Sequence, residues 1–247
     1  QETMKYLCEN IQGCVLGYTQ SDEITLILID YKKITSSAFF DYEVQKICSI
    51  TASMATMAFN KFLKENIDEY SLNNMGTAFI LHGETGRLSD KEKNILKNIM
   101  IYEEAYQFDA RCFNIPKEEV TNLVYWRQLD ASRNSIQMVG QANFSHKELQ
   151  NKSCNDIQDM LMTQKGINWN DLPTYQKRGS CCVKENHFIE NEKGTQICFP
   201  EGCSDPFEDE ETLTGVYRSS WIIDTEIPIF KGEGRDYIDR LIYVGED

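Results

Sequence analysis

The chain has 247 residues, a formal net charge of −14 at pH 7, and 41% hydrophobic residues with only 5 prolines. This length allows one large domain or two small ones, and this composition excludes a wholly disordered chain. No apolar run approaches the roughly 20 residues of a membrane span, and no signal-peptide pattern is present, so we expect no membrane association.

Acidic residues are unevenly distributed along the chain. Six of them lie in 201–211 without any Lys or Arg, whereas 125–133 and 177–184 are locally basic. Because a binding face can be basic on its own, the negative net charge only weakly opposes a nucleic-acid partner. The 9 cysteines are an odd number, and several fall within predicted strands or helices. They favour buried, reduced thiols and a cytoplasmic location over a secreted disulfide framework.

The first half of the chain predicts helices interrupted by short strands. Strands are expected where apolar runs flank a turn, and helices where apolar residues recur at helical spacing. We predict a helix over 4–11, strands over 14–16 and 24–29, a loop over 32–40, a long helix over 41–63, and strands over 78–81 and 106–113.

The second half predicts two long helices followed by strands. Pro116 and the acids after it favour a helix start, and Ser145 with Glu148 forms a capping-box signature. We predict helices over 118–139 and 145–165, a strand over 179–184, a polar loop or hairpin excursion over 185–211, and strands over 216–223 and 238–244.

Two adjacent carboxylates, Asp22 and Glu23, lie where a turn enters the strand at 24–29. Two-metal phosphoryl or nucleotidyl transfer uses carboxylates to hold Mg²⁺ ions. Neighbouring side chains on a strand point to opposite faces, so one carboxylate is expected to bind metal and the other to orient the site. The alternative is an acidic turn that water solvates.

Two basic segments are candidate phosphate contacts. Residues 125–135 place Arg127 and Arg133 on a predicted helix, and 176–180 place Lys177 and Arg178 beside a glycine. Arginine is well suited to phosphate because its planar fork binds two oxygens. The alternatives are a buried Trp126 with a surface Arg127–Asp130 ion pair, and a solvated turn at 176–180.

Cysteines and one histidine near the predicted strand at 179–184 invite a zinc hypothesis. The set is Cys181, Cys182, His187, Cys198 and Cys203. Its spacing does not match the regular pairing of zinc fingers, so zinc is disfavoured.

Five motifs in one order resemble those of tRNA-His guanylyltransferases and their bacterial and archaeal Thg1-like relatives. Residues 130–135 are more similar to the bacterial or phage branch, and the resemblance covers roughly 14–182. The motifs are Tyr18-x-Gln20-Ser21-Asp22-Glu23, Phe108-Asp109-Ala110-Arg111, Trp126-Arg127-Gln128-x-Asp130, Gly166-Ile167-Asn168-Trp169-Asn170 and Lys177-Arg178-Gly179-Ser180.

The resemblance implies an α+β fold with a palm-like antiparallel sheet and helices packed on it. It implies a template-dependent nucleotidyltransferase that adds nucleotides to the 5′ end of tRNA in the 3′→5′ sense, as 5′-end repair or guanylate addition to tRNA-His. It also implies two Mg²⁺ ions, ATP and GTP as substrates, tRNA as partner and a homotetramer. The expected division is a catalytic domain over 1–184 and an extension with an acidic loop over 185–247.

Site residues follow from the same resemblance. Asp22 matches a metal-binding aspartate, and Ser21 and Glu23 match its catalytic neighbours. Lys46 and Asn134 are expected to bind nucleotide. The predicted tRNA contacts are Arg127, Arg133, Lys177 and Arg178. The family's first metal-binding aspartate is expected in a strand before Gln1. The alternatives are a non-catalytic tRNA-binding palm domain and a palm-fold nucleotide cyclase.

Overall fold

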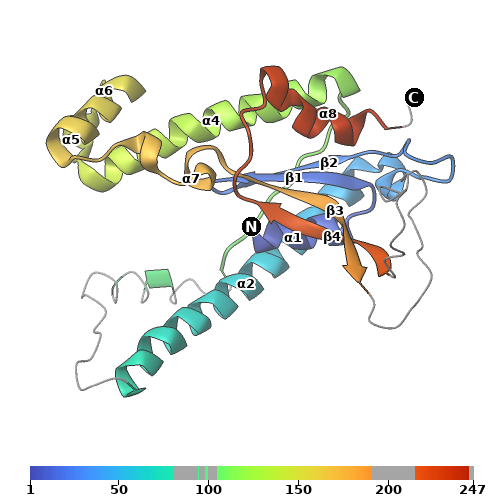
Figure 1. Ribbon diagram of the computed structural model, residues 1–247, viewed down its shortest axis with the longest axis horizontal. Helices are drawn as coiled ribbons and strands as arrows, with labels where there is room; N and C mark the ends of the chain where they lie inside the picture. Colours follow the sequence, from blue (N-terminus) through green and yellow to red (C-terminus); the bar gives the residue numbers. More distant parts are fainter. Residues whose placement is uncertain (81–93, 95–97, 100–104, 191–214, 245–247) are drawn as a thin grey trace, which may run out of the picture. The chain divides into compact units, whose positions relative to one another are not determined.

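The structure is a computed structural model that describes residues 1–80, 94, 98–99, 105–190 and 215–244 (Figure 1). The chain forms two compact units, one of Gln1–Gly13 and Ile29–Pro116 and the other of Cys14–Leu28 and Lys117–Asp247. The predicted boundary between a catalytic domain over 1–184 and an extension over 185–247 falls within strand β3, Ser180–Glu190. That boundary stays a prediction. Among the described helices, none is long and apolar enough to cross a membrane.

Two helices dominate the first unit. Helix α1, Glu2–Asn10, buries one stripe of side chains at helical spacing, and α2 runs from Val44 to Ile80 after a 3₁₀ turn at Phe39–Tyr42. The buried stripe is Met4, Leu7, Cys8 and Ile11. The Tyr6 and Phe62 rings pack edge to face with centroids 6.5 Å apart. Both predicted helices are confirmed, and the strand predicted over 78–81 is wrong for 78–80, which continue α2.

The segment 105–116 is extended but forms no strand, so the strand predicted over 106–113 is wrong. Its backbone bonds to side chains of α2 instead of to a neighbouring strand. The backbone of Tyr106 exchanges hydrogen bonds with the Asn60 side chain at 2.9 and 3.3 Å, and the Phe108 amide donates to Thr56 Oγ1 at 3.0 Å. The Phe59 ring packs against the Tyr106 and Phe108 rings of the segment. Alternating apolar residues therefore serve here to cover a helix.

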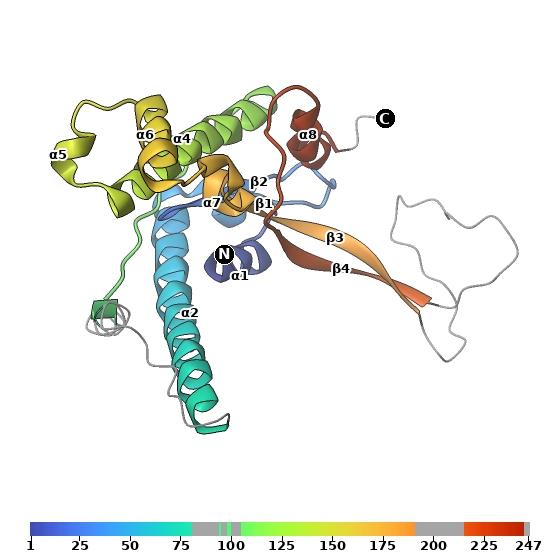
Figure 2. The same ribbon diagram turned by 60° about the vertical axis from the view of Figure 1, so that its left-hand side comes forward.

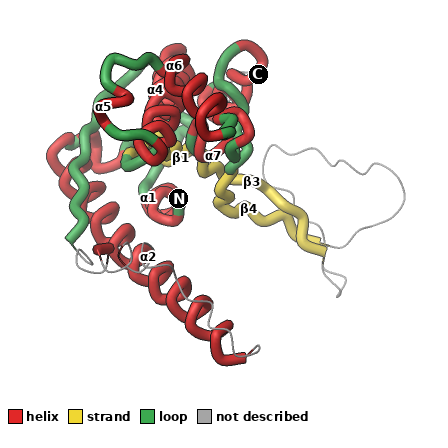
Figure 3. Tube along the Cα trace, turned by 90° about the vertical axis from the view of Figure 1, so that its left-hand side faces the viewer, coloured by secondary structure: helices red, strands yellow, loops and turns green. Residues whose placement is uncertain are grey.

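An antiparallel sheet forms the centre of the second unit. Its strands are β1 (Cys14–Gln20), β2 (Glu23–Leu28), β3 (Ser180–Glu190) and β4 (Gly215–Asp224), in the order β2-β1-β3-β4. β1 pairs with β3 only as far as Leu16 and Val183, whereas β3 and β4 pair over their full length. Strands β3 and β4 therefore continue past Val183 as a two-stranded ribbon beyond the rest of the sheet (Figure 3). The predicted hairpin excursion begins as this ribbon, and the acidic run at 201–211 lies outside the described residues.

Helices α4 (Lys117–Asn143) and α8 (Asp236–Ile242) lie on the same face of this sheet (Figures 1 and 2). The strand predicted over 238–244 is wrong, because 238–242 belong to helix α8. Ile238 and Ile242 lie one helical turn apart and are both buried, which suits a helix that packs one face. Helix α4 confirms the predicted helix over 118–139.

The helix predicted over 145–165 is interrupted. It is α5 (His146–Leu149), a bend, α6 (Cys154–Met160) and a π turn at Leu161–Lys165. The predicted capping box of Ser145 and Glu148 is confirmed, and a second box of Ser153 and Asp156 restarts the helix. Hydrogen bonds from the Ser145 hydroxyl and amide lower the pKa of Glu148. The remaining elements are α7 (Thr174–Arg178) and 3₁₀ turns at Trp169–Asp171 and Gly232–Arg235.

These elements confirm the predicted α+β class, with an antiparallel sheet and helices packed on it. The centre of the second unit is apolar. Tyr18, Leu16, Phe230 and Ile227 are all at most 1% exposed.

Gly179 and Gly166 both have a positive φ but differ in their surroundings, which gives a matched test. At Gly179 (φ +84) a Cβ would lie 2.5 Å from the Thr19 carbonyl oxygen, whereas at Gly166 (φ +67) no atom lies within 4 Å. We expect Gly179→Ala to destabilise the fold by about 3 kcal/mol or more, because strain and a clash add, and Gly166→Ala by about 1 kcal/mol. Urea denaturation measures both, and equal losses would contradict the close approach.

Candidate functional site

The predicted acidic turn is the loop of the β1–β2 hairpin. Gln20 and Glu23 are the last paired residues, so Ser21 and Asp22 form a two-residue loop. Ser21 has φ +51, in the left-handed region that glycine normally occupies in such loops. The Thr19 hydroxyl also donates to the Glu23 carbonyl at 2.9 Å. The loop thus holds Asp22 at the end of two paired strands.

The two adjacent carboxylates have different surroundings. One Glu23 oxygen, Oε2, accepts a hydrogen bond from Gln20 Nε2 at 2.9 Å and lies 3.3 Å from Arg127 Nη1 on α4. Asp22 is exposed, and the described residues form neither a hydrogen bond nor an ion pair with its carboxylate. Glu23 is therefore the carboxylate that connects the loop to α4, and Asp22 is the one open to a ligand.

The surface of helix α4 contradicts one of the two alternatives that the sequence left open. Trp126 is 73% exposed, so the alternative that buried it in the core is wrong. Arg127 pairs with Glu23, and it is Arg133 that pairs with Asp130, at 3.0 Å. The predicted Arg127–Asp130 pair is replaced because the hairpin loop brings a carboxylate to Arg127.

Gln128 forms the buried network on α4. It is 2% exposed, donates to the Pro228 carbonyl at 2.8 Å and accepts from the Phe230 amide at 3.0 Å. The Gln128 amide therefore gives a hydrogen-bond partner to the Pro228 carbonyl and to the Phe230 amide, two backbone groups of the apolar segment 227–230. Gln128 belongs to the motif Trp126-Arg127-Gln128-x-Asp130, and the sequence alone left open whether it contacts a base or forms a buried network.

The Gly166–Asn170 motif connects α4 to α7. Trp169 Nε1 donates to the buried Ser135 hydroxyl at 3.0 Å, and the Asn170 carbonyl accepts from Lys177 Nζ at 2.6 Å. Trp169 also packs against an apolar cluster at the end of α4. Lys177, a predicted phosphate contact, is thus also a contact between neighbouring motifs.

The Lys177–Ser180 motif connects α7 to β1. The Tyr18 hydroxyl donates to the Arg178 carbonyl at 2.7 Å, and Arg178 Nε donates to the Ile227 carbonyl at 3.2 Å. Burial raises the pKa of Tyr18 above its ordinary value, so the hydroxyl stays protonated and acts as a donor. The sequence did not single out Tyr18 or Gly179 for this junction.

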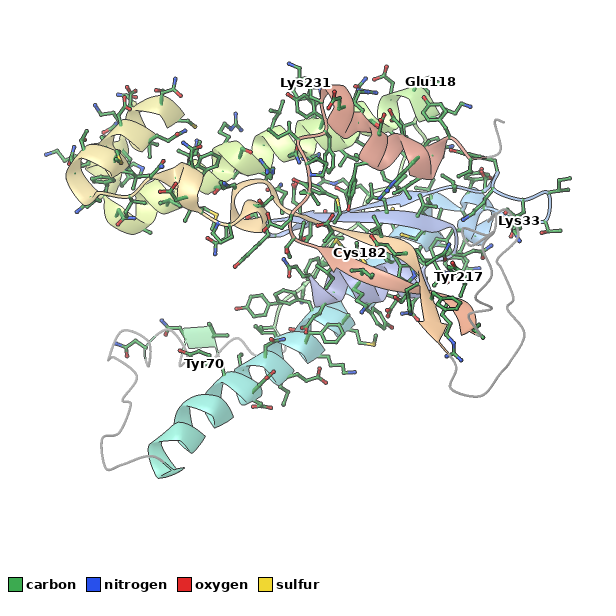
Figure 4. All side chains as sticks on the ribbon, in the orientation of Figure 1. Lys33, Tyr70, Glu118, Cys182, Tyr217 and Lys231 are labelled. Carbon is green, nitrogen blue, oxygen red and sulfur yellow. The ribbon has the colours of Figure 1, made fainter. Side chains whose placement is uncertain are left out.

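Four of the five sequence motifs are therefore joined in a closed circuit within the second unit, which we call the motif ring. Each motif contacts the next and the last returns to the first, except that α4 makes the second contact through Ser135, five residues after the motif that ends at Asp130. Its contacts are Glu23–Arg127, Ser135–Trp169, Asn170–Lys177 and Arg178–Tyr18. Residues far apart in the sequence thus connect the hairpin that carries Asp22 to α4 and α7. Figure 4 shows the side chains on this sheet and its helices.

The other predicted nucleotide contacts lie on different elements. Lys46 is in the first turn of α2 in the first unit, with Nζ 4.9 Å from the centre of the Phe40 ring. Phe40, Asp41 and Tyr42 before it have φ values of +49, +49 and +63. Asn134 is half-buried on α4 in the second unit. The motif Phe108–Arg111 belongs to the first unit, where Asp109 and Arg111 pair with each other at 3.3 Å.

Three of the five members of the cysteine and histidine set lie within the described residues. Cys181 and Cys182 are buried in β3, where Figure 4 labels Cys182. Cys198 and Cys203 lie outside the described residues. Within the part of the chain that the structure describes, no three His, Cys, Asp or Glu side chains are grouped to hold a metal ion.

A double-mutant cycle tests the contact between the hairpin and α4. Arg127 and Glu23 are 44% and 51% exposed, so we expect Arg127→Ala and Glu23→Gln to couple by only about 0.2–1 kcal/mol. Arg133→Ala is the control, because Arg133 pairs with Asp130, and its effect should add to that of Glu23→Gln. Urea denaturation measures the cycle. Zero coupling for Arg127 would show that the pair does not form in solution.

Comparisons with known proteins show which family this chain is similar to. The family model described as Thg1, tRNAHis guanylyltransferase, matches residues 1–116. A bacterial tRNA(His) guanylyltransferase (Thg1)-like protein solved in complex with ATP is 35% identical, with a TM-score of 0.67, over 99% of this chain and 77% of its own. The same kind of bacterial protein in complex with GTP is 32% identical, with a TM-score of 0.61, over 98% of this chain and 76% of its own.

A viral relative is more distant. An uncharacterized protein of Acanthamoeba polyphaga mimivirus is 27% identical over 198 residues, or 75% of this chain. The chain spans 60% of the length of that viral protein. The two bacterial structures, by contrast, match nearly all of this chain at 30% identity or more. This chain belongs to the tRNAHis guanylyltransferase (Thg1) family, and its similarity is to the bacterial Thg1-like proteins.

Proposed function

We propose that this chain is a nucleotidyltransferase that adds nucleotides to the 5′ end of tRNA in the 3′→5′ sense, with the opposite strand of the tRNA as template. Family membership supports the reaction class. The bacterial relatives were solved with ATP and with GTP, which supports nucleoside triphosphates as substrates. The single observation that carries the proposal is the motif ring, because it connects four motifs of the family to the hairpin that carries one exposed carboxylate.

We propose that Asp22 binds Mg²⁺ at this site. Mg²⁺ takes oxygen ligands, and proteins commonly hold it with one or two carboxylates plus waters and substrate phosphates. An exposed aspartate without a competing partner fits one such ligand. When bound, the ion would neutralise phosphate charge that develops during transfer. A second ion needs further carboxylate ligands near Asp22. The described residues contain no group of three His, Cys, Asp or Glu side chains that could hold a metal ion.

The surrounding residues would fix the position of Asp22. Glu23 and Arg127 tie the loop to α4, and Ser21 sets its backbone. Phosphoryl and nucleotidyl transfer depend mainly on positioning and electrostatics, so a rigid loop contributes directly to rate. Lys46 and Asn134 remain the proposed contacts to the nucleotide.

The four predicted tRNA contacts differ in how available they are. Arg178 and Lys177 donate to backbone carbonyls, and Arg127 pairs with Glu23. The side chain of Arg133 is 64% exposed, and among the described residues its ion pair is with Asp130. Arg133 is therefore the best of the four candidates for an RNA phosphate. The homotetramer and the cytoplasmic location stay predictions.

Replacing Asp22 tests the catalytic proposal. We expect Asp22→Asn to lower nucleotide addition to a 5′-truncated tRNA at least about 100-fold, because an electrostatic contact to the reacting phosphate is lost. Its stability should not change, since no described residue pairs with the Asp22 carboxylate. The control is Asp159→Asn, another exposed aspartate, on α6. Equal activity of the wild type and Asp22→Asn would contradict the catalytic role of Asp22. If both proteins bind tRNA and neither adds a nucleotide, the result would favour the non-catalytic tRNA-binding domain.

Salt dependence tests the phosphate contact at Arg133. We expect Arg133→Ala to reduce the slope of log affinity for tRNA against log salt by about 1, because one phosphate contact is lost. Arg133→Lys keeps the charge and should keep the slope. Filter binding or fluorescence anisotropy over a salt series measures both. An unchanged slope in Arg133→Ala would remove Arg133 from the RNA surface.

A further inference from the structure

Two cysteines that are distant in the sequence meet in the first unit. Cys48 lies near the start of α2, and Cys112 lies 64 residues later in the extended segment 105–116. Their sulfur atoms are 3.7 Å apart, and both residues are half-buried. Solvent can therefore reach a pair of thiols that are already in contact.

The pair joins two elements at a defined place. Cys112 Sγ also lies 3.9 Å from the carbonyl oxygen of Val44, the first residue of α2. The other end of the segment is held to the middle of α2, by Asn60 and Thr56. The two thiols are thus the contact between the far end of the segment and the first turn of the helix.

The reduced pair is a hydrogen-bonded dithiol. Partial desolvation, followed by the hydrogen bond with Cys48, raises the pKa of the Cys112 thiol above its ordinary value. A protonated thiol is a poor nucleophile, so the pair is stable as a dithiol until an oxidant reaches it.

We propose that Cys48 and Cys112 form a reversible disulfide in the presence of a low-molecular-weight disulfide. One protein thiolate attacks the small disulfide, forms a mixed disulfide and releases one small thiol. The second protein sulfur then attacks the mixed disulfide and releases the second small thiol. One protein S–S bond replaces one small S–S bond, and the two protein protons go to the two released thiols. Side-chain rotation has to close the gap from 3.7 Å to the bonded length of about 2.05 Å.

The cross-link would act on the helical turn that carries Lys46. Cys48 lies two residues after Lys46, and the disulfide would tie that turn to segment 105–116. The disulfide would close a loop between two residues 64 positions apart. Closing this loop restricts the unfolded chain, so the oxidised protein should be more stable than the reduced protein.

Peptide mapping of the full chain tests the proposal. The protein is incubated with oxidised glutathione, remaining thiols are blocked, and proteolytic peptides are analysed by mass spectrometry with and without reductant. We expect a peptide pair joined through Cys48 and Cys112 that reductant separates. Oxidation should raise the melting temperature by several degrees, and reductant should reverse the shift.

Single substitutions identify the pair. Cys48→Ser and Cys112→Ser should each abolish both the cross-link and the shift. Cys154→Ser is the matched control, because Cys154 is also half-buried, and it should keep both. A wild-type map in which Cys48 and Cys112 carry only mixed disulfides or blocked thiols would overturn the proposal. So would a melting shift that persists in Cys48→Ser.

Discussion

The close approach of α7 to β1 is the constraint on which the second unit depends. Gly179 follows α7 with φ +84, and a side chain there would meet the Thr19 carbonyl at 2.5 Å. Only glycine gives the backbone this conformation without strain and without a clash. The approach lets the Tyr18 hydroxyl bond the Arg178 carbonyl, and it lets β3 begin in register beside β1 at Ser180. Since β1 continues into the loop at Asp22, this junction sets where the candidate site lies.

The motif ring uses three side chains that were predicted to contact tRNA. Arg127 was predicted to contact tRNA, yet it holds Glu23, and Lys177 and Arg178 donate to backbone carbonyls. A surface ion pair contributes little to stability, so the value of Arg127 lies in orienting the loop. Positioning through such contacts suits transfer reactions that depend on placed charge. Asp22 remains open to a ligand because its neighbour takes the contact with α4.

The fold was predictable where periodicity and caps are strong, and the errors have physical reasons. The stripes of α2 and α4 and the Ser145 capping box identified their helices. The alternation at Tyr106–Phe113 indicated a strand, but Asn60 and Thr56 satisfy its backbone from a helix. At Ile238 and Ile242 a short apolar run fitted both periods, and only packing against β1 and α4 selects the helix. Trp126 was a candidate core residue by composition and is exposed.

By itself, the sequence determined the chemistry available to this chain: an acidic pair at a strand start, basic residues beside glycine, and five motifs in the order of one family. Local preferences suffice for that, because turn residues, caps and motif order are read along the chain. The tertiary structure decided which carboxylate is open, which arginine holds the other, and which cysteines meet. Those outcomes depend on side chains separated by tens to more than a hundred positions, and only folding brings their atoms within hydrogen-bond distance.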